Sequence, residues 1–386
     1  MEKFPRDLVV PPDLSHGHPM YAGRARRPVY VDLLPPCNHA CPAGENIQAW
    51  LGLAQAGRYQ EAFQCLVRDN PLPAIHGRVC YHPCESACNR AELDESVSIH
   101  AIERFLGDRA RELGWEIDCP TPPSGKRVLV VGAGPSGLSA AYHLRRLGHV
   151  VEIHDAGPVA GGMMAAGIPA YRLPRPVLAE EIARIERMGV RIVLNSRVTD
   201  LLAAKRDGEF DAVFLAIGAH LGKKTEIPAR DAGVILDAVS FLAKSAAGEV
   251  PKLGRRVAVY GGGNTAMDAA RVAKRLGSEP LIIYRRDRGH MPAHPSEADD
   301  ALAEGVQIHW LRSIKAIERS SVELEIMELD AAGKPQPTGR TERLEADCLL
   351  LALGQDTDTS FLRGVAGLAF ERDGTLCVGP DLMTGQ

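Results

Sequence analysis

The spacing of hydrophobic and polar positions changes near residue 127. Before that point the apolar residues favour helices, and residues 1 to about 120 contain no convincing strand. We predict helices over 46–56, 59–67 and 98–113. The stretch 119–125 is rich in proline, glycine and serine, and it is therefore predicted to be a linker.

From Arg127 onward, short apolar runs alternate with glycine-rich loops and helices. Residues 128–131 form the first run, 132–137 form a glycine-rich loop, and a helical pattern then leads to a second run at 150–154. The same order returns later in the chain, at 257–260, 261–266 and 281–284. Two such units predict two parallel sheets. A further apolar run at 349–353 is predicted to be a buried strand that returns to the first sheet.

The composition is that of an ordinary globular chain of 386 residues, long enough for two or three domains. A net charge of −4 gives no reason to expect nucleic acid or an anionic membrane as a partner. The longest apolar runs, such as 348–353, are far too short to cross a bilayer. Met1–Pro5 lacks the basic flank and apolar stretch of a signal peptide, so we expect a cytoplasmic protein.

The first glycine loop has the spacing that binds a dinucleotide. Gly132 permits a tight turn, Gly134 lets the backbone approach a pyrophosphate, and Gly137 lets helix and strand pack closely. The phosphates would lie at the helix N-terminus, beside Pro135 and Ser136. Asp155, about twenty residues further on, is placed to accept hydrogen bonds from a ribose. The alternative is a glycine-rich turn without a ligand.

The second glycine loop has the same pattern with alanine in its third position. Its predicted cofactor-binding residues are Gly261, Gly263, Asn264, Thr265 and Ala266. The strand that follows ends in Arg285 and Arg286 instead of an acid, and a guanidinium there can bind a 2′-phosphate. This favours NADP(H) over NAD(H), although either arginine could instead be a solvated surface charge.

Six of the nine cysteines lie within about fifty residues. They are Cys37, Cys41, Cys65, Cys80, Cys84 and Cys88. In a reducing compartment such a group indicates a metal site more than a disulfide framework. Neither dinucleotide fold contains the closely spaced dithiol of a disulfide reductase, and no side chain forms a convincing catalytic acid–base group.

Several segments together resemble the glutamate synthase small-subunit family. The segments are Val131–Leu138, Gly161–Pro174, Tyr284–Asp287 and Met291–Ala293. The same family includes the N-terminal half of dihydropyrimidine dehydrogenase and the large subunit of electron-bifurcating transhydrogenases. The resemblance covers nearly the whole chain. It implies FAD on the first fold and NADPH, occasionally NADH, on the second.

The resemblance also implies roles for residues outside the two loops. Gly161, Gly162, Ile168 and Arg172 are expected near the flavin. Segments ending in Gly218 and Gly354 resemble the family's two crossovers between the dinucleotide domains.

The cysteine-rich region resembles the iron–sulfur domain of that family. By this match one [4Fe-4S] cluster is held by Cys41, Cys80, Cys84 and the non-cysteine ligand Glu103. Glu103 shares a helical face with apolar residues, so its carboxylate is expected to point inward. Cys37 and Cys88 would be remnants of a second site, although either could replace Glu103. The competing interpretations are a zinc site, or a domain without metal that serves for docking.

The predicted fold class is α/β, with two nested Rossmann-like dinucleotide-binding domains after an α-helical Cys-rich domain. The expected boundaries are 1–120 for the helical domain, 121–235 for the first part of the FAD domain, 236–340 for the NAD(P)H domain and 341–386 for the returning FAD segment. Related chains continue into a Gly-Gly-Asp segment and a helix that this sequence does not include. Either the sequence is trimmed or FAD is less enclosed than usual.

The function expected from these features is electron transfer between a nicotinamide cofactor and a partner redox subunit, through flavin and one cluster. The partner would be a ferredoxin-like subunit or one that reduces or oxidises a substrate. The alternatives are a self-contained diaphorase that acts on small acceptors, and a flavoprotein scaffold whose helical domain is a docking module.

Overall fold

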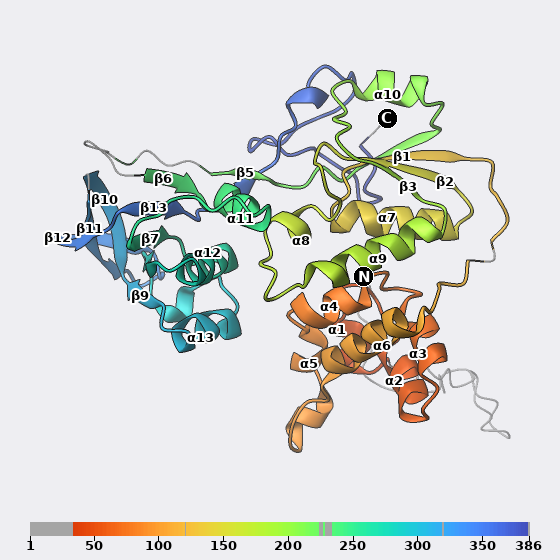
Figure 1. The fold of residues 1–386 in the computed structure, drawn as a ribbon, viewed down its shortest axis with the longest axis horizontal. Coiled ribbons are helices and arrows are strands. Elements are labelled where there is room, and N and C mark those ends of the chain that lie inside the picture. The colour runs from red at the N-terminus through yellow and green to blue at the C-terminus, as the bar shows by residue number, and fades with distance from the viewer. Residues whose placement is uncertain (1–33, 120, 224–226, 228–233, 319, 385–386) are drawn as a thin grey trace, which may run out of the picture. The chain divides into compact units, whose positions relative to one another are not determined.

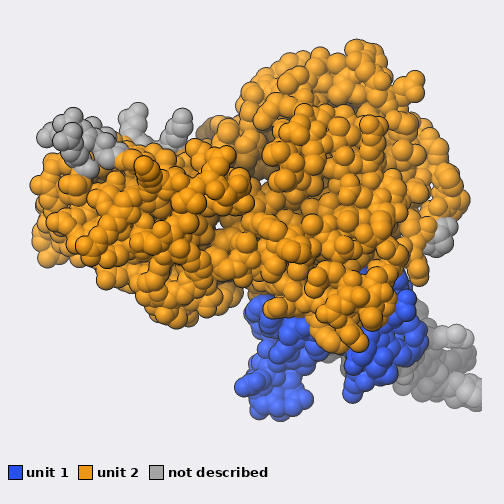
Figure 2. Space-filling view, viewed as in Figure 1, with its two compact units in different colours: residues 1–70, 82–102 blue, residues 71–81, 103–386 orange. Residues whose placement is uncertain are grey.

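The computed structural model describes residues 34–119, 121–223, 227, 234–318 and 320–384. The contacts divide the chain into two compact units (Figures 1 and 2). Unit 1 contains Met1–Asn70 and His82–Ile102, and unit 2 contains Pro71–Tyr81 and Glu103–Gln386. Met1–Pro5 and the last two residues, on which some expectations rested, lie outside the described residues.

The N-terminal part of the described chain is helical, and residues 34–119 contain no strand. Its helices are α1 (Pro36–Ala40), α2 (Ile47–Gln55), α3 (Tyr59–Leu66), α4 (Pro73–Val79), α5 (Pro83–Ser86), η1 (Asn89–Glu92) and α6 (Ile99–Leu113). The three predicted helices are thus confirmed. The Asn46 side chain accepts a hydrogen bond from the Ala49 N–H and caps α2, while Trp50 and Phe63 are fully buried. No helix in the described part of the chain is long and apolar enough to cross a membrane.

The first sheet of unit 2 is parallel, with strand order β3-β2-β1-β4. Its strands are β1 (Arg127–Val131), β2 (Val150–His154), β3 (Arg191–Val193) and β4 (Ala212–Leu215). The helices of this fold are α7 (Pro135–Arg146), α8 (Met163–Ala166), α9 (Arg175–Arg187) and α10 (Leu201–Asp207). Residues 128–131 of β1 are all buried because both faces of the strand are covered: α7 packs on β1, and Leu129 and Val131 pack with Leu201 and Phe210.

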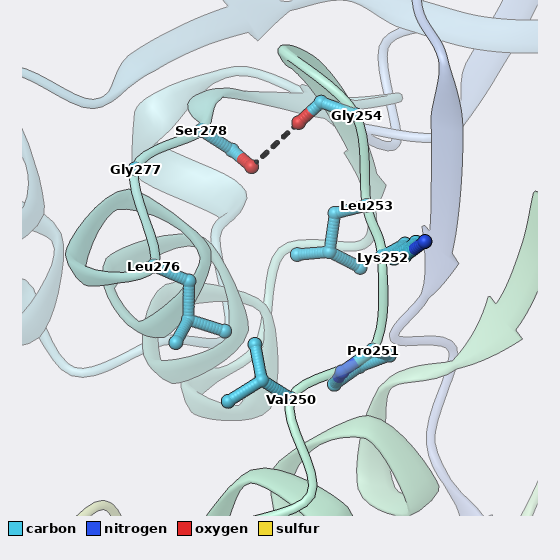
Figure 3. A pocket seen from close by; sticks show the side chains of 8 residues that line it. All are labelled: Val250, Pro251, Lys252, Leu253, Gly254, Leu276, Gly277 and Ser278. Atoms are coloured by element: carbon cyan, nitrogen blue, oxygen red, sulfur yellow. Dashed lines mark hydrogen bonds between the residues drawn. The ribbon is translucent and has the colours of Figure 1, made fainter.

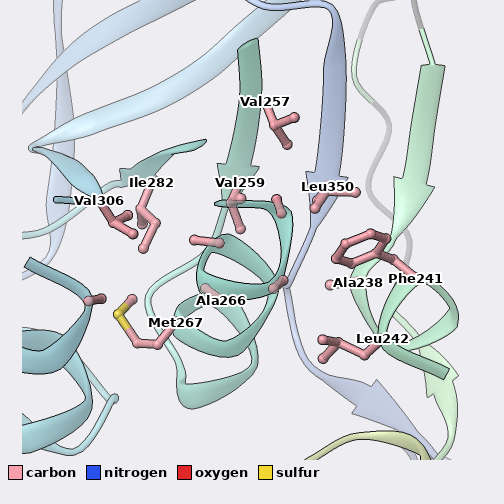
Figure 4. Close-up of a cluster of buried hydrophobic side chains, with 14 of the residues drawn as sticks. Ala238, Phe241, Leu242, Val257, Val259, Ala266, Met267, Ile282, Val306 and Leu350 are labelled. Atoms are coloured by element: carbon pink, nitrogen blue, oxygen red, sulfur yellow. The ribbon is translucent and has the colours of Figure 1, made fainter. Parts of the chain in front are cut away.

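The second sheet is also parallel, with strand order β6-β13-β7-β8-β9. Its strands are β6 (Val234–Asp237), β7 (Arg256–Tyr260), β8 (Glu279–Tyr284), β9 (Gln307–Trp310) and β13 (Cys348–Leu351). The helices of this fold are α11 (Ala238–Ala246), α12 (Asn264–Arg275), η2 (Arg288–His290) and α13 (Pro295–Ala303). Figure 4 shows α12 and α11 packed on one face, where Met267 and Phe241 meet Val259, Ile282 and Leu350 of the strands.

The other face of the second sheet is covered by a smaller antiparallel sheet. Its strands are β10 (Arg312–Glu318), β11 (Ser321–Leu329) and β12 (Pro335–Glu345). Val322 and Leu324 of β11 pack against Ala258, Ile283 and Leu349 of the parallel strands. Because both faces are covered, the parallel strands can be apolar throughout.

The prediction for residues 349–353 is wrong in one respect. The run does form a buried strand, but β13 pairs with β6 and β7 of the second sheet, with Leu349 opposite Ile235 and Ala258. A run that is apolar on both faces indicates a central parallel strand but carries no information about which of two similar sheets it joins. The segment that returns to the first fold, expected at 341–386, therefore starts only after β13.

After β13 the chain returns to the first fold through a short two-stranded sheet and a segment that packs on the core of that fold. After β13 the chain forms β14 (Gln355–Asp356), which pairs antiparallel with β5 (Leu221–Gly222). It then enters η3 (Ser360–Leu362), where Leu362 packs with Leu129 and Phe210 of the first fold. The last part of the described chain thus contributes to the core of the first fold without adding a strand to its sheet.

Candidate functional site

The first glycine loop joins the carboxyl end of β1 to the N-terminus of α7. Gly132 has a φ of +109°, and a Cβ there would lie 2.3 Å from the carbonyl oxygen of Ala216. At Gly134 an added Cβ would meet only the Gly162 Cα, at 3.9 Å. The loop therefore has room beside Gly134 for a ligand at the start of a 12-residue helix, where backbone N–H groups favour anions.

Asp155 holds this loop in place. One carboxylate oxygen accepts the N–H of Ala133 at 2.6 Å, and the other accepts the N–H of Gly157 at 2.7 Å. The side chain is only half-buried, so its remaining lone pairs can still accept a hydrogen bond from a ribose. Ribose binding by Asp155 stays a prediction. The two hydrogen bonds that hold the loop were not predicted from the sequence.

The Gly161-Gly162 pair lies against the first loop. The Gly161 N–H donates to the Ala133 carbonyl at 2.8 Å, and a Cβ at Gly162 would lie 2.8 Å from the Gly134 Cα. Ile168 follows a short helix, and its carbonyl accepts a hydrogen bond from Arg175 at 2.8 Å. The first loop and the Gly161-Gly162 pair, which the resemblance assigned to one flavin site, are therefore close in space.

Arg172 makes a contact that the sequence did not reveal. Its guanidinium donates to Asp268 of α12 at 2.7 Å and pairs with Glu297 of α13. The side chain is 12% exposed and the two carboxylates are less than 10% exposed. Burial raises the pKa of Asp268 to about 6, while the Arg172 charge opposes that shift. Arg172 thus joins the first dinucleotide fold to the helices of the second.

The second glycine loop joins β7 to α12 in the same way. Gly261 has a φ of +148°, and a Cβ there would lie 2.2 Å from the Ala352 carbonyl oxygen, whereas a Cβ at Gly263 would meet nothing within 4 Å. Asn264 accepts the N–H of His294 at 2.8 Å. The loop that carries the Met291–Ala293 motif is therefore fixed onto the second glycine loop, with Thr265 half-buried in the same turn.

Arg285 and Arg286 lie directly after β8, at the same edge of the sheet as the second loop. Arg285 is exposed and makes no ion pair with any described residue. Arg286 is half-buried, and its Nε is a buried donor without a hydrogen-bond partner among the described residues. Two guanidinium groups at this edge suit a 2′-phosphate, because each offers several donors in a planar array.

The remaining predicted cofactor residues lie where the chain passes between the two folds. Gly218 and Gly354 are both exposed and have positive φ angles of +68° and +105°. The Lys223 N–H donates to the Gly354 carbonyl at 2.9 Å, next to the β5–β14 pair. Their place at the crossovers agrees with the resemblance.

The four predicted cluster ligands are divided between the units. Cys41 and Cys84 belong to unit 1, whereas Cys80 and Glu103 belong to unit 2, so the set stays a prediction. Glu103 is 7% exposed, which agrees with the expected inward direction of its carboxylate. All nine cysteines are described, and none of them is in a disulfide. Cysteine thiolates are the ligands that iron–sulfur clusters prefer, so the chemistry of the three predicted cysteines fits a cluster.

Tyr81, which directly follows Cys80, is a functional candidate that sequence reasoning missed. Its ring stacks on His294, with centroids 4.5 Å apart and an angle of 13° between the planes. Burial raises the pKa of Tyr81, and the nearby charge of Arg172 opposes that rise. An aromatic residue next to a ligand motif was the one available signal, and it is too common to interpret alone.

A cavity of about 290 Å³ lies away from all of these residues (Figure 3). It is lined by residues 250–254 and 276–278, where Ser278 donates to the Gly254 carbonyl at 2.8 Å. These segments precede β7 and β8, so the cavity is at the amino ends of the strands. Parallel sheets bind nucleotides beyond the carboxyl ends, and the cavity is therefore not the candidate site.

Two family models match the chain. Residues 126–385 match the pyridine nucleotide-disulphide oxidoreductase family. Residues 22–115 match the second domain of dihydropyrimidine dehydrogenase, which is described as a 4Fe-4S cluster domain. The predicted pairing of a dinucleotide-binding region with an iron–sulfur domain is confirmed.

Curated relatives resemble most of the chain. The NADP(+)-dependent formate dehydrogenase subunit beta of Moorella thermoacetica is 39% identical, over 89% of this chain and 54% of its own length. The NADPH-Fe(3+) oxidoreductase subunit beta of Geobacter sulfurreducens is 37% identical, over 86% and 52%. The glutamate synthase [NADPH] small chain of Escherichia coli is 33% identical, over 83% and 74%. The chain spans about half the length of the first two relatives.

Solved structures support the fold. FprA of Mycobacterium tuberculosis, in complex with NADPH, is similar with a TM-score of 0.53 and 20% identity, over 64% of this chain and 73% of that one. Thioredoxin reductase of Lactococcus lactis is similar with a TM-score of 0.51 and 22% identity, over 68% and 87%. The match over residues 126–385 and the similarity to the glutamate synthase small chain show the family. The chain belongs to the pyridine nucleotide-disulphide oxidoreductase family, in the group whose members resemble the glutamate synthase small chain.

Proposed function

We propose that the chain is an FAD-containing NAD(P)H oxidoreductase that passes electrons between a nicotinamide cofactor and a partner redox subunit. The observation that carries the proposal is the presence of two glycine loops with the same geometry in one chain, each with open space at its second glycine. A protein that acts on one nucleotide needs a single loop of this kind. Two loops fit a protein that brings two dinucleotides together.

The groups bound at these sites would supply hydride transfer between nicotinamide and flavin and single-electron transfer through a cluster. The residues of the chain bind and position them. Gly134 and the N-terminus of α7 would hold the FAD pyrophosphate, with Asp155 fixing the loop. Gly263 and the N-terminus of α12 would hold the nicotinamide dinucleotide, with Arg285 and Arg286 on its 2′-phosphate.

The subunit role is supported by the relatives and by what the chain lacks. The formate dehydrogenase and the NADPH-Fe(3+) oxidoreductase relatives are both named as beta subunits. Beyond Cys88 the sequence contains only Cys119, Cys348 and Cys377, which are too far apart in the chain for a closely spaced dithiol. Burial raises the pKa of Cys348 to about 11, which leaves it unreactive. We therefore propose a partner protein as the electron acceptor or donor; the cytoplasmic location stays a prediction.

The first prediction concerns flavin. We expect Gly134→Val to purify without FAD, because its side chain would fill the space beside the loop while Gly134 keeps an ordinary φ of −75°. The matched control is Gly263→Val, at the equivalent position of the second loop, which should keep FAD and lose NADPH binding. Flavin is measured by absorbance and NADPH by calorimetry. A Gly134→Val protein with full flavin content would contradict the assignment.

The second prediction concerns the choice of nicotinamide. Replacing Arg285 and Arg286 with alanine should weaken NADPH binding by about 1.5–3 kcal/mol and leave NADH binding nearly unchanged, because NADH lacks the 2′-phosphate. Arg288→Ala is the control, since Arg288 is exposed and already paired with Asp299. Equal losses for the two nucleotides, or a wild type that prefers NADH, would show that the arginines do not select NADP(H).

The third prediction concerns the cluster and its fourth ligand. Cys84→Ser should lose iron and the visible absorbance of the cluster, whereas Cys65→Ser, in the same unit, should keep both. Comparing Glu103→Gln with Cys88→Ser identifies the fourth ligand, because only the true ligand variant should lose the paramagnetic signal that appears on reduction with NADPH. Iron that stays in the Cys84 variant would refute the predicted set.

The fourth prediction concerns the partner. Native purification from the source cells should recover other redox subunits, and the isolated chain should reduce an artificial dye but no natural small substrate at a comparable rate. A monomer that rapidly turns over a small acceptor would be a self-contained diaphorase instead. A flavoprotein that neither reduces a dye nor oxidises NADPH would be a scaffold.

A further inference from the structure

Three potential metal-binding side chains lie together in unit 1, outside the sites described above. His82 directly precedes α5, Glu85 lies within α5, and His100 is the second residue of α6. Their ligand atoms all lie within 4.8 Å of one another. No other group of this kind was found among the described residues.

The two imidazole rings present the same atom to one carboxylate. The Nδ1 of His100 is 2.8 Å from one oxygen of Glu85, and the Nδ1 of His82 is 3.2 Å from the other. The rings are stacked, with centroids 4.2 Å apart and an angle of 19° between their planes. Two nitrogen donors and one carboxylate therefore converge from segments that are separated along the chain.

Among the described residues, the ion pairs of the Glu85 carboxylate are with imidazoles alone. Glu85 is 12% exposed, and its partners among the described residues are the two imidazoles and the N–H of His100 at 3.0 Å. No described lysine or arginine pairs with it. A carboxylate that is largely removed from water is stabilised by a cation more than by neutral donors.

The backbone at His82 adds an independent observation. Its φ and ψ are +39° and 61°, in the left-handed region that side-chain-bearing residues rarely adopt. Such conformations persist where surrounding contacts maintain them, and they are concentrated at ligand sites. Here the strained residue is one of the three donors.

We propose that His82, Glu85 and His100 form a binding site for a single divalent cation of the zinc class, distinct from the iron–sulfur site. Two imidazoles and one carboxylate are a known zinc donor set, and they leave a fourth position for water. The imidazoles are about a third exposed, which gives an ion access from solvent.

The cation would join two segments of the cysteine-rich unit. It ties the turn that carries Cys84 to the start of α6, and the segment with Cys88 lies between them in the chain. The site would therefore hold the second half of the cysteine motif in one conformation. This role depends neither on the nucleotide sites nor on electron transfer.

The test is zinc titration of the full chain as purified, with calorimetry for affinity and zinc K-edge X-ray absorption for the ligands. We expect one tight site with a nitrogen and oxygen shell at about 2.0–2.2 Å and no sulfur shell at about 2.3 Å. His100→Ala and Glu85→Gln should each weaken binding by more than about 100-fold, a larger loss than second-shell changes cause. His309→Ala is the matched control, because His309 Nδ1 lies 4.0 Å from Glu342 but belongs to no group of three potential metal ligands among the described residues.

A sulfur shell in the wild-type spectrum would place the ion on the cysteines and overturn the proposal. So would the absence of a tight site, or unchanged affinity in both variants. Because the wild-type spectrum identifies the ligands by itself, the test remains decisive even if one variant fails to fold.

Discussion

The buried Arg172 guanidinium, held between Asp268 and Glu297, is the interaction on which the candidate site depends. A single chain that binds two dinucleotides must bring two separate folds into a fixed relation. Two carboxylates from different helices, both largely removed from water, would repel each other without cations beside them. Arg271 of α12 pairs with Glu297, and Arg172, which pairs with both carboxylates, comes from the first fold. Tyr171, the preceding residue, adds to the same contact, since its ring lies 3.8 Å from the Arg275 guanidinium carbon.

The local parts of the site could be predicted from the sequence, because they depend on neighbouring residues. Gly132 must turn at positive φ, Gly134 must leave space, and the helix must start at Pro135, so the spacing itself specifies the loop. The partners of Arg172 could not be predicted in this way. Asp268 lies 96 positions away, and nothing in its own segment marks it as the partner of an arginine in the first fold.

The assignment of β13 to the wrong sheet also arose because its partners are distant in the sequence. Residues 348–351 form β13 in the second sheet, next to β7. On one face Leu350 of β13 and Val257 of β7 pack against helices, and on the other face Leu349 and Ala258 pack against β11. Both faces are apolar, so the pattern identifies a central strand, but two sheets in this chain could accept one. The antiparallel sheet from β10 to β12 supplies the second apolar face, and the sequence analysis did not anticipate it. Its presence explains why the second sheet is buried on both sides.

Tyr81 connects the cysteine motif to the nucleotide site in a way that neither motif shows alone. It follows Cys80 in the chain and its ring stacks on His294, whose N–H donates to the Asn264 side chain at the start of α12. All of these residues belong to unit 2. A change in the backbone at Cys80 therefore acts one residue away from a ring that stacks on the loop fixed to Gly262. Tyr81 thus links the residue next to Cys80 to the loop that packs on the second glycine loop, within one unit.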